Sequence, residues 1–180
     1  MPKRCIMIFP KFNNMKIIDA IREKYDPLAK HVAPHITLVF PFISDITTED
    51  LKKHIINCLS GVNAFPIMLK SVVSTTYTGN YLFLNIVKGK EEIIKLHKRL
   101  YCGILEEFMP EWLRDGNYFP HMTIGNIADA ELFKSAVEAT KDFCETFETT
   151  VDGISVEFID ENEDSIIEFH FNFNSERGHL

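Results

Sequence analysis

The sequence lacks long apolar runs and has little tryptophan. Its 180 residues include one Trp, and no stretch approaches the roughly 18 consecutive apolar residues that a membrane-spanning helix needs. The start of the chain, MPKRCIMIFPKF, has too short an apolar run for a secretory signal peptide. We therefore expect a cytoplasmic protein that has no membrane partner.

Cysteine is also sparse and is not arranged in pairs. The four cysteines stand at positions 5, 58, 102 and 144, far apart and without a Cys-x-x-Cys motif. Each occupies a position where a small apolar residue would serve. In a protein expected in the reducing cytosol, we interpret them as reduced core thiols rather than as disulfides or metal ligands.

Positive charge is in the minority. The chain has 19 Lys and Arg residues against 26 Asp and Glu residues, which gives a net charge of −7. A basic face supplies most of the affinity of proteins for long nucleic acids, so this balance argues against binding of long duplex DNA. It does not exclude a small nucleotide held in a local pocket. The length predicts one domain or two small lobes that share a core.

Two stretches stand out in what the sequence does contain, 34–40 (PHITLVF) and 120–125 (PHMTIG). Each has a Pro, a His, one further residue and a Thr, inside an apolar run typical of a β-strand. Side chains at i and i+2 of a strand point to the same face, so each stretch places an imidazole beside a hydroxyl. Imidazole transfers protons near neutral pH, and a Thr hydroxyl can donate to a phosphate oxygen. Two such pairs facing each other would suit chemistry that needs one acid and one base.

The remaining pattern predicts a duplicated order of elements. Hydrophobic periodicity and turn residues predict helices that begin after Asn13 or Asn14, at Thr47, at residue 90 and after Asp129. The third of them is predicted to run to residue 107. The strands are predicted at 4–9, 35–40, 65–77, 81–87, from near 119, and at 146–160 and 165–174. Each half then runs strand, helix, His-Thr strand, helix and hairpin, and the two halves share almost no identity beyond the motif.

The spacing of equivalent positions supports this duplication. From His35 to Tyr81 is 81 − 35 = 46 residues, and from His121 to Ile166 is 166 − 121 = 45. We expect a single bilobal domain over 1–180, with lobes related by a pseudo-two-fold axis. The groove between the lobes would carry the two motif pairs, His35 with Thr37 and His121 with Thr123.

The paired His-x-Thr motifs, 121 − 35 = 86 residues apart, resemble those of the two-histidine (2H) phosphoesterase superfamily, which includes 2'-5' RNA ligase-like proteins and cyclic phosphodiesterases. The resemblance covers nearly the whole chain. It implies an α+β fold in which each lobe is a mainly antiparallel sheet with helices on its outer face. It also implies metal-independent action, without a cofactor, on a 2',3'-cyclic phosphate or a 2'-5' or 3'-5' linkage, as in RNA processing, with ligation as the reverse reaction. By the same resemblance His35 and His121 are the catalytic acid and base, in an order left open, and Thr37 and Thr123 bind the phosphate.

Three further predictions concern the surroundings of the motifs. The strand 81–87 alternates so that Tyr81 and Phe83 face the groove, where they either stack on a base or simply fill the lobe interface. His170 is either a third groove imidazole or a solvated strand residue. Members of the family that the chain resembles often carry a basic or Tyr side chain in the groove; the sequence does not place one, and the candidates are Lys70, Arg4 and Lys3.

Other functions stay open at this point. A nucleotide- or RNA-binding module could keep the groove without turnover. The two histidines could instead bind a metal, although neither motif contains an Asp, Glu or Cys as a further ligand. The His-Thr pairs could also be coincidental in a structural protein. We expect a monomer whose partner is a nucleotide, a cyclic phosphate or a short RNA.

Overall fold

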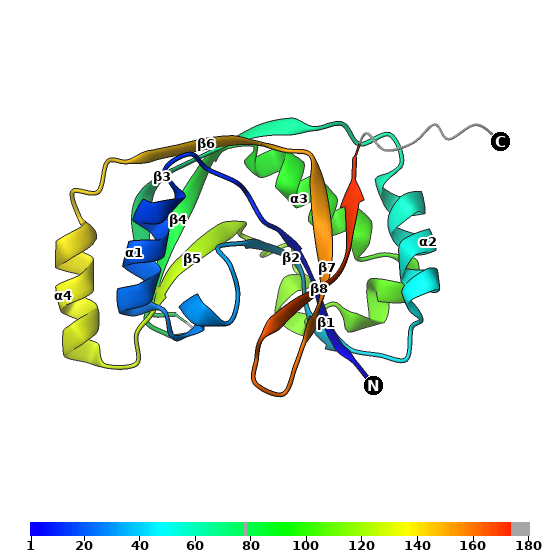
Figure 1. Cartoon of the computed structure of the whole chain (residues 1–180), viewed down its shortest axis with the longest axis horizontal. Coiled ribbons are helices and arrows are strands. Elements are labelled where there is room, and N and C mark those ends of the chain that lie inside the picture. Colours follow the sequence, from blue (N-terminus) through cyan, green and yellow to red (C-terminus); the bar gives the residue numbers. More distant parts are fainter. Residues whose placement is uncertain (78, 174–180) are drawn as a thin grey trace.

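The structure, a computed structural model, describes residues 1–77 and 79–173 (Figure 1). Its strands are β1 (Lys3–Ile8), β2 (Ile36–Ile43), β3 (Phe65–Thr75), β4 (Tyr81–Lys88), β5 (His121–Asn126), β6 (Thr146–Val151), β7 (Gly153–Ile159) and β8 (Ser165–Asn172). Its α-helices are α1 (Met15–Tyr25), α2 (Thr48–Leu59), α3 (Lys90–Leu100) and α4 (Ala130–Thr140). Short 3-10 helices are η1 (Pro27–Lys30), η2 (Gly103–Phe108) and η3 (Glu111–Leu113). Residue 174, the predicted end of the last strand, lies outside the described residues.

The strands form two four-stranded antiparallel sheets, in the orders β2-β1-β7-β8 and β5-β4-β3-β6. This confirms the predicted α+β class with two antiparallel lobes. The two motif strands, β2 and β5, each lie at an edge of their sheet, and they contact each other. The edges that carry the motifs therefore meet between the two sheets.

Alternation along β4 explains which face of its sheet is covered. Leu82, Leu84 and Ile86 are buried, whereas Tyr81 and Phe83 are half-buried. Because successive side chains of a strand point to opposite faces, the aliphatic set joins the core while the aromatic set lies on the other face. This is the arrangement that the sequence pattern predicts.

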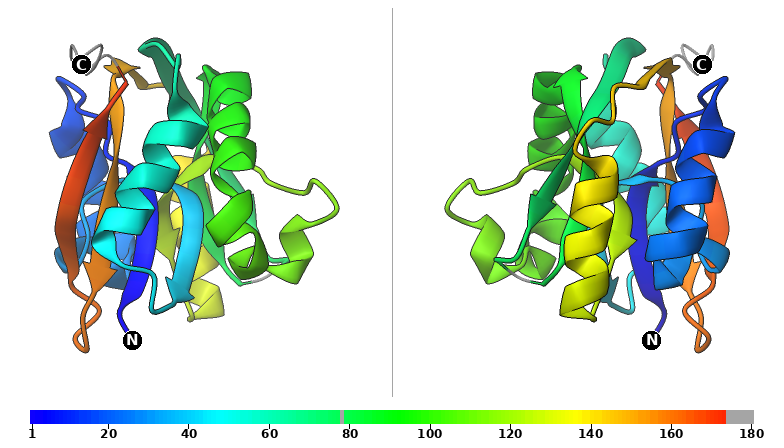
Figure 2. Two further views of the ribbon diagram at one scale, coloured as in Figure 1. Left: turned by 90° about the vertical axis from the view of Figure 1, so that its right-hand side faces the viewer. Right: turned by 90° about the vertical axis from the view of Figure 1, so that its left-hand side faces the viewer.

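The helices lie in two pairs over the sheets. Figure 2 shows α2 and α3 from one side of the molecule and α1 and α4 from the other. Helix α2 contacts α3, and α3 contacts β2, whereas α1 contacts β5. The helix after β1 thus packs on the sheet of β5, and the helix after β4 packs on the sheet of β2. No helix in the described part of the chain is both long and apolar enough to cross a bilayer.

The predicted strand 146–160 is two strands that belong to different sheets. Residue Asp152 separates β6, which pairs with β3, from β7, which pairs with β1. A Cβ on Gly153 would overlap the carbonyl oxygen of Phe171, so only glycine fits where the chain changes sheets. The hairpin β3–β4 likewise joins the sheet of β5, and each sheet takes strands from both halves of the chain.

The predicted helix 90–107 is also shorter than expected. Helix α3 ends at Leu100, and Gly103, with φ of +50°, begins η2. The apolar spacing continues across this break, and Leu105 is buried as predicted, but Ile104 is exposed. A 3-10 turn carries side chains at i and i+3 on one face, so periodicity alone does not distinguish it from a last helical turn.

Candidate active site

The two His-x-Thr motifs have matching local structures. Flanking Ile36 and Leu38 of the first motif are fully buried, as are Met122 and Ile124 of the second. The motif histidines and threonines alternate with these residues and lie on the opposite face of each strand. All four are half-buried: His35, Thr37, His121 and Thr123. The alternation predicted from the sequence is thus present in both strands.

The imidazoles are held by the same hydrogen bond. Nδ1 of His35 donates to the carbonyl oxygen of Ala33 (2.9 Å), and Nδ1 of His121 donates to that of Phe119 (2.7 Å). A carbonyl oxygen can only accept, so Nδ1 carries the proton in each neutral ring. The lone pair is then on Nε2, which is the nitrogen left to exchange a proton with a ligand.

Burial lowers the pKa of both imidazoles. Desolvation is the main cause for His35, whose pKa falls to about 4, and the nearby Arg22 and His121 lower it further, against the opposing effects of the Ala33 carbonyl and Asp26. Burial also lowers the pKa of His121, opposed by the Phe119 carbonyl. Both rings are therefore neutral at pH 7 in the ligand-free protein. A bound phosphate would raise both pKa values, because a nearby anion favours the charged ring.

Aromatic rings surround His121. Phe83 pairs with Thr123 across the sheet, and its ring centroid lies 3.8 Å from that of His121. Tyr81 stacks on Phe83 at 5.6 Å. The centroid of the Phe119 ring is 5.9 Å from that of His121, and Nζ of Lys90 lies 4.5 Å from the centroid of Phe119. The two aromatic residues expected at the groove thus share a face with the second motif.

A pocket of about 190 Å³ borders the first motif. It is lined by His35 and Thr37 together with Lys3, Cys5 and Met7 of β1 and residues of the β7–β8 turn. His121 and Thr123 do not line it. Of the three cation candidates, Lys3 therefore lines the same pocket as the first His-Thr pair.

The other two cation candidates do not reach this pocket. Arg4 is buried and forms an ion pair with Glu168, with Nε and Oε2 2.8 Å apart. Lys70 is exposed on β3, opposite Thr146.

His170 shares a face with Thr37 but lies far from it. Pairing across the sheet aligns Thr37, Met7, Ser155 and His170 in one row. β8 is the opposite edge strand from β2, so three strand spacings, about 14 Å, separate the ends of this row. His170 is exposed, and its Nδ1 lies 2.8 Å from Oγ of Ser155. It is a surface strand residue and does not line the pocket of His35.

Three side chains that the sequence analysis did not single out hold the free edge of β2. Tyr118 donates its hydroxyl proton to the carbonyl oxygen of Thr37 (2.7 Å), and His97 donates from Nδ1 to that of Leu38 (2.8 Å). The backbone N–H of Phe40 donates to the hydroxyl oxygen of Tyr101 (2.9 Å). The rings of His97 and Tyr118 stack at 3.7 Å. These contacts satisfy backbone groups that an edge strand leaves unpaired, and they position the strand carrying His35 and Thr37.

A buried ion pair shapes the loop that leads to His35. Nε of Arg22 lies 2.8 Å from Oδ2 of Asp26, and the same guanidinium donates to the carbonyl oxygens of Val32 and Leu28. The pair lies in an apolar environment where removing one partner would leave an uncompensated charge. Arg22 and Asp26 are four residues apart at the end of α1, and this spacing could have predicted the ion pair from the sequence. It could not have predicted its burial, because exposed pairs have the same spacing.

The cysteines correct one prediction. All four are free thiols, but only Cys5 is in the core. Cys58 is half-buried, and Cys102 and Cys144 are exposed. Cys102 lies in a turn and Cys144 in a loop, where a small residue fits but is not buried. The small size of cysteine therefore did not predict which of these side chains are in the core.

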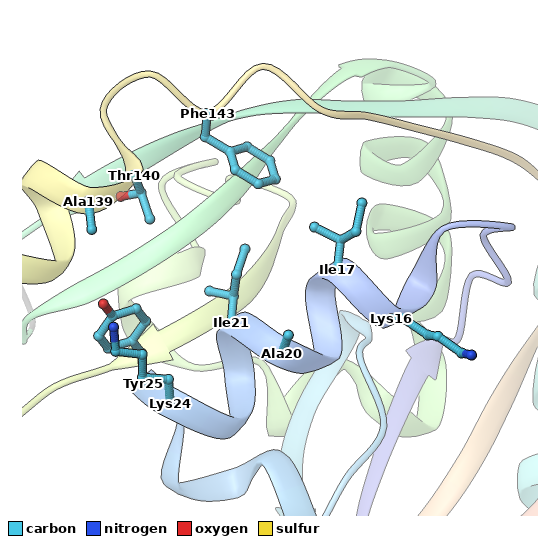
Figure 3. Close-up of a pocket in the computed structure, with 9 residues that line it drawn as sticks. All are labelled: Lys16, Ile17, Ala20, Ile21, Lys24, Tyr25, Ala139, Thr140 and Phe143. Atoms are coloured by element: carbon cyan, nitrogen blue, oxygen red, sulfur yellow. The ribbon is translucent and has the colours of Figure 1, made fainter.

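A wider apolar pocket, of about 510 Å³, lies between α1 and α4 (Figure 3). Ile17 and Ile21 of α1 point into it, as does Phe143, which follows α4. The pocket has no motif residue in its lining. Because its walls are mostly apolar and neither His-Thr pair reaches it, we do not assign it to the active site.

Comparison with known proteins finds a matching family and related sequences. The profile of the 2'-5' RNA ligase superfamily matches residues 10–163. A candidate phosphoesterase of Bacillus cereus (strain B4264) is 31% identical over 128 residues, which cover 70% of this chain and 71% of that protein. One of Bacillus licheniformis is 26% identical over 120 residues, covering 66% and 68%.

Solved structures of low sequence identity share the fold. Escherichia coli LigT, crystallised in complex with 3'-AMP, superposes with a TM-score of 0.59 at 13% identity, covering 95% of this chain and 97% of LigT. The TT0787 protein of Thermus thermophilus superposes with a TM-score of 0.61 at 16% identity, covering 97% and 99%. The chain therefore belongs to the 2'-5' RNA ligase superfamily, as its paired His-x-Thr motifs predicted, and its relatives are candidate phosphoesterases.

Proposed function

We propose that the protein is a metal-independent phosphodiesterase that acts on 2',3'-cyclic phosphates or on 2'-5' or 3'-5' oligonucleotide linkages. One observation carries the proposal. His35 directly precedes β2 and His121 begins β5, two edge strands that contact each other. Each histidine has Nδ1 bonded to the carbonyl two residues earlier and a Thr two residues later. Two imidazoles that both present Nε2 can supply the acid and the base of a hydrolysis. Family membership and the nucleotide bound to LigT support a nucleotide-like substrate.

The proposed reaction moves two protons. His35, with the pKa of about 4, is the base: its Nε2 takes a proton from water as the water oxygen bonds to phosphorus. The bond from phosphorus to the leaving oxygen breaks, and that oxygen takes a proton from Nε2 of a protonated His121. Thr37 and Thr123 donate hydrogen bonds to the non-bridging oxygens, and Lys3 adds positive charge at the first motif. Ligation would use the same groups with a hydroxyl of a second RNA in place of water: that oxygen bonds to phosphorus and the ring oxygen of the cyclic phosphate leaves, which is the reverse of cleaving the linkage to a cyclic phosphate.

Tyr81 and Phe83 are proposed to bind the base of the substrate. Their stacked rings lie beside His121, and aromatic side chains bind bases of any sequence by stacking. A base held there would place its ribose phosphate near the second motif. The net charge of −7 favours a mononucleotide or a short RNA over a long duplex.

A second function is favoured by the depressed pKa values. With both imidazoles neutral at pH 7, the ligand-free protein has no proton to donate to a leaving group. A nucleotide-binding module without turnover would have this property. The enzyme requires that binding of the phosphate protonates one of the two imidazoles, whereas the binding module does not.

The experiment that tests the proposal is hydrolysis of a panel of 2',3'-cyclic nucleotides and 2'-5' and 3'-5' dinucleotides in EDTA. The wild type is compared with His35→Ala and His121→Ala, and with His31→Ala as the control, since His31 is a loop residue that contacts Asp164. Turnover that survives EDTA and is lost only in the two motif variants supports the phosphodiesterase. Binding without consumption, unaffected by the motif substitutions, supports the binding module and contradicts the enzyme.

A further inference from the structure

Three potential metal ligands meet in the helical layer formed by α2 and α3. His54 and Cys58 are four residues apart on α2, so they lie on the same side of the helix, and Cys102 lies in the turn that follows α3. One ligand atom from each residue can be chosen so that all lie within 4.8 Å of one another. The two sulfur atoms are 3.3 Å apart, and Sγ of Cys58 is 3.7 Å from Nδ1 and 3.5 Å from Nε2 of His54. Nothing proposed above for the phosphodiester reaction uses these side chains.

The local sequence explains why these residues meet. Leu51, Ile55 and Leu59 bury one face of α2 in the core, and His54 and Cys58 lie at the margin of that face, both half-buried. After α3 ends, Gly103 adopts φ of +50°, and a Cβ there would lie 3.7 Å from His54. The turn therefore brings Cys102 to α2 and leaves room beside the imidazole.

The spacing suits a tetrahedral metal ion. Bond lengths of about 2.3 Å to sulfur and 2.0–2.1 Å to nitrogen correspond to about 3.8 Å between two sulfurs and 3.6 Å between sulfur and nitrogen. The sulfur atoms would need to move apart by about half an ångström from their present 3.3 Å. The distances from Cys58 to the imidazole already agree. Thiolate and imidazole are the ligands that Zn²⁺ prefers, and the set has no hard oxygen ligand.

The imidazole is already oriented by a neighbour. Nε2 of His54 donates to the carbonyl oxygen of Leu100 at 3.0 Å, which puts the lone pair on Nδ1. A ligating histidine commonly donates its other ring N–H to a carbonyl in this way. Sγ of Cys58 lies 3.7 Å from Nδ1 and 3.5 Å from Nε2, so the ring would need to turn for Nδ1 to point at an ion between the sulfurs.

We propose that His54, Cys58 and Cys102 bind one Zn²⁺, with water in the fourth position. Exposed Cys102 leaves the site open to solvent on one side, which provides both an entry path and the water ligand. The ion would join α2 to the end of α3. Its role would be to stabilise the helical layer, and it would take no part in the reaction proposed for the motif histidines.

A disulfide between the same two sulfurs is the competing outcome. The two sulfur atoms are 3.3 Å apart, well beyond the roughly 2.05 Å of an S–S bond, and joining them requires a two-electron oxidant that removes both thiol protons. A metal ion displaces the thiol protons as it binds.

The test is zinc binding by the whole chain after reduction and removal of metal, measured by competition with a chromophoric chelator. Cd²⁺ then provides a second readout, because two thiolates give a charge-transfer absorption in the ultraviolet. We expect one equivalent of Zn²⁺ and an increase in Tm for the wild type. Cys58→Ser, Cys102→Ser and His54→Ala should each weaken binding more than about tenfold and abolish the increase in Tm.

Two controls separate this site from others. Cys144→Ser removes an exposed thiol outside the cluster, and His121→Ala removes a motif imidazole, and both should bind like the wild type. Metal-free melting of every variant identifies those that fail to fold, and Cd²⁺ absorption then tests the folded ones. Equal zinc binding by wild type and Cys58→Ser would overturn the proposal. So would loss of binding in His121→Ala alone, or a reduced protein that takes up no zinc and loses two thiols to a disulfide in air.

Discussion

His35 and His121 each keep Nδ1 bonded to a backbone carbonyl, so the acid and base roles of the proposed reaction would fall on Nε2 of both rings. The sequence predicts which residue types share a strand face, because that depends on a two-residue period. It does not predict this tautomer, which depends on where the carbonyls of Ala33 and Phe119 point after folding. Nor does it assign the roles, since the lowered pKa of each ring arises chiefly from burial in the folded protein.

The pH dependence of kcat/KM follows from those pKa values. The base works only above its pKa, about 4 for His35, and the acid works only below its own pKa, which burial lowers for His121 from 6.5. We therefore predict a bell-shaped profile with its maximum between pH 4 and 6.5, since kcat/KM reports the groups of the free enzyme. Initial rates on a cyclic nucleotide across pH 4–9 measure it. A profile that rises to a plateau above pH 7 would contradict the assignment.

Glu157 is a fully buried acid that the proposed reaction does not use. Its Oε1 has no hydrogen-bond partner among the described residues, and burial raises its pKa from 4.5 to about 7. The folded state therefore binds more protons than the unfolded state between these values, and this group lowers stability as pH rises through that window.

Glu157→Gln should remove this loss of stability. We expect the variant to gain free energy of unfolding relative to wild type as pH rises from 5 to 8, by up to about 3 kcal/mol. Urea unfolding at both pH values measures the difference, with the exposed Glu161→Gln as a control that should follow the wild type. The motif histidines affect wild type and variant equally, so the comparison isolates Glu157. An equal pH dependence in both proteins would refute the raised pKa.

At the scale of elements, β2 depends on side chains outside its own sheet. Tyr118, Tyr101 and His97 bond to its free edge. We predict that Tyr118→Phe leaves the carbonyl oxygen of Thr37 without this donor and lowers the free energy of unfolding by about 0.5–1.5 kcal/mol. The substitution should also lower kcat more than it changes KM, because Thr37 would move from the position in which it stabilises the transition state. The pH profile should stay as in wild type.

The control for Tyr118→Phe is Tyr77→Phe, which changes an exposed ring. Urea unfolding and steady-state kinetics compare the two variants. If Tyr118→Phe matches Tyr77→Phe in both measurements, the edge of β2 does not need this hydrogen bond to hold the first motif.

Local patterns predicted the elements better than their partners. The alternation of Leu82, Leu84 and Ile86 identified the buried face of β4 because it is a property of one strand. The break between β6 and β7 depends on the close approach of Gly153 to Phe171, which are distant in sequence. The contact of α1 with the sheet of β5 could not be predicted for the same reason. The hydrophobic periodicity of a helix or a strand shows which of its faces is buried, but not which distant segment covers that face.

At the scale of the molecule, the two sheets bring β2 and β5 into contact, and the proposed reaction requires both. Each motif alone offers one proton-transfer group. If the two histidines act as one unit, removing either should disable the reaction, and removing the second should change little more. A pair of independent residues would instead give losses that multiply.

The most direct test is therefore kcat/KM in EDTA for His35→Ala, His121→Ala and the double variant on the best substrate of the panel. Our account predicts a loss of roughly 10²–10⁴-fold in each single variant and a similar loss in the double variant. Full activity in either single variant, or a double-variant loss equal to the product of the two, would contradict a single two-histidine active site.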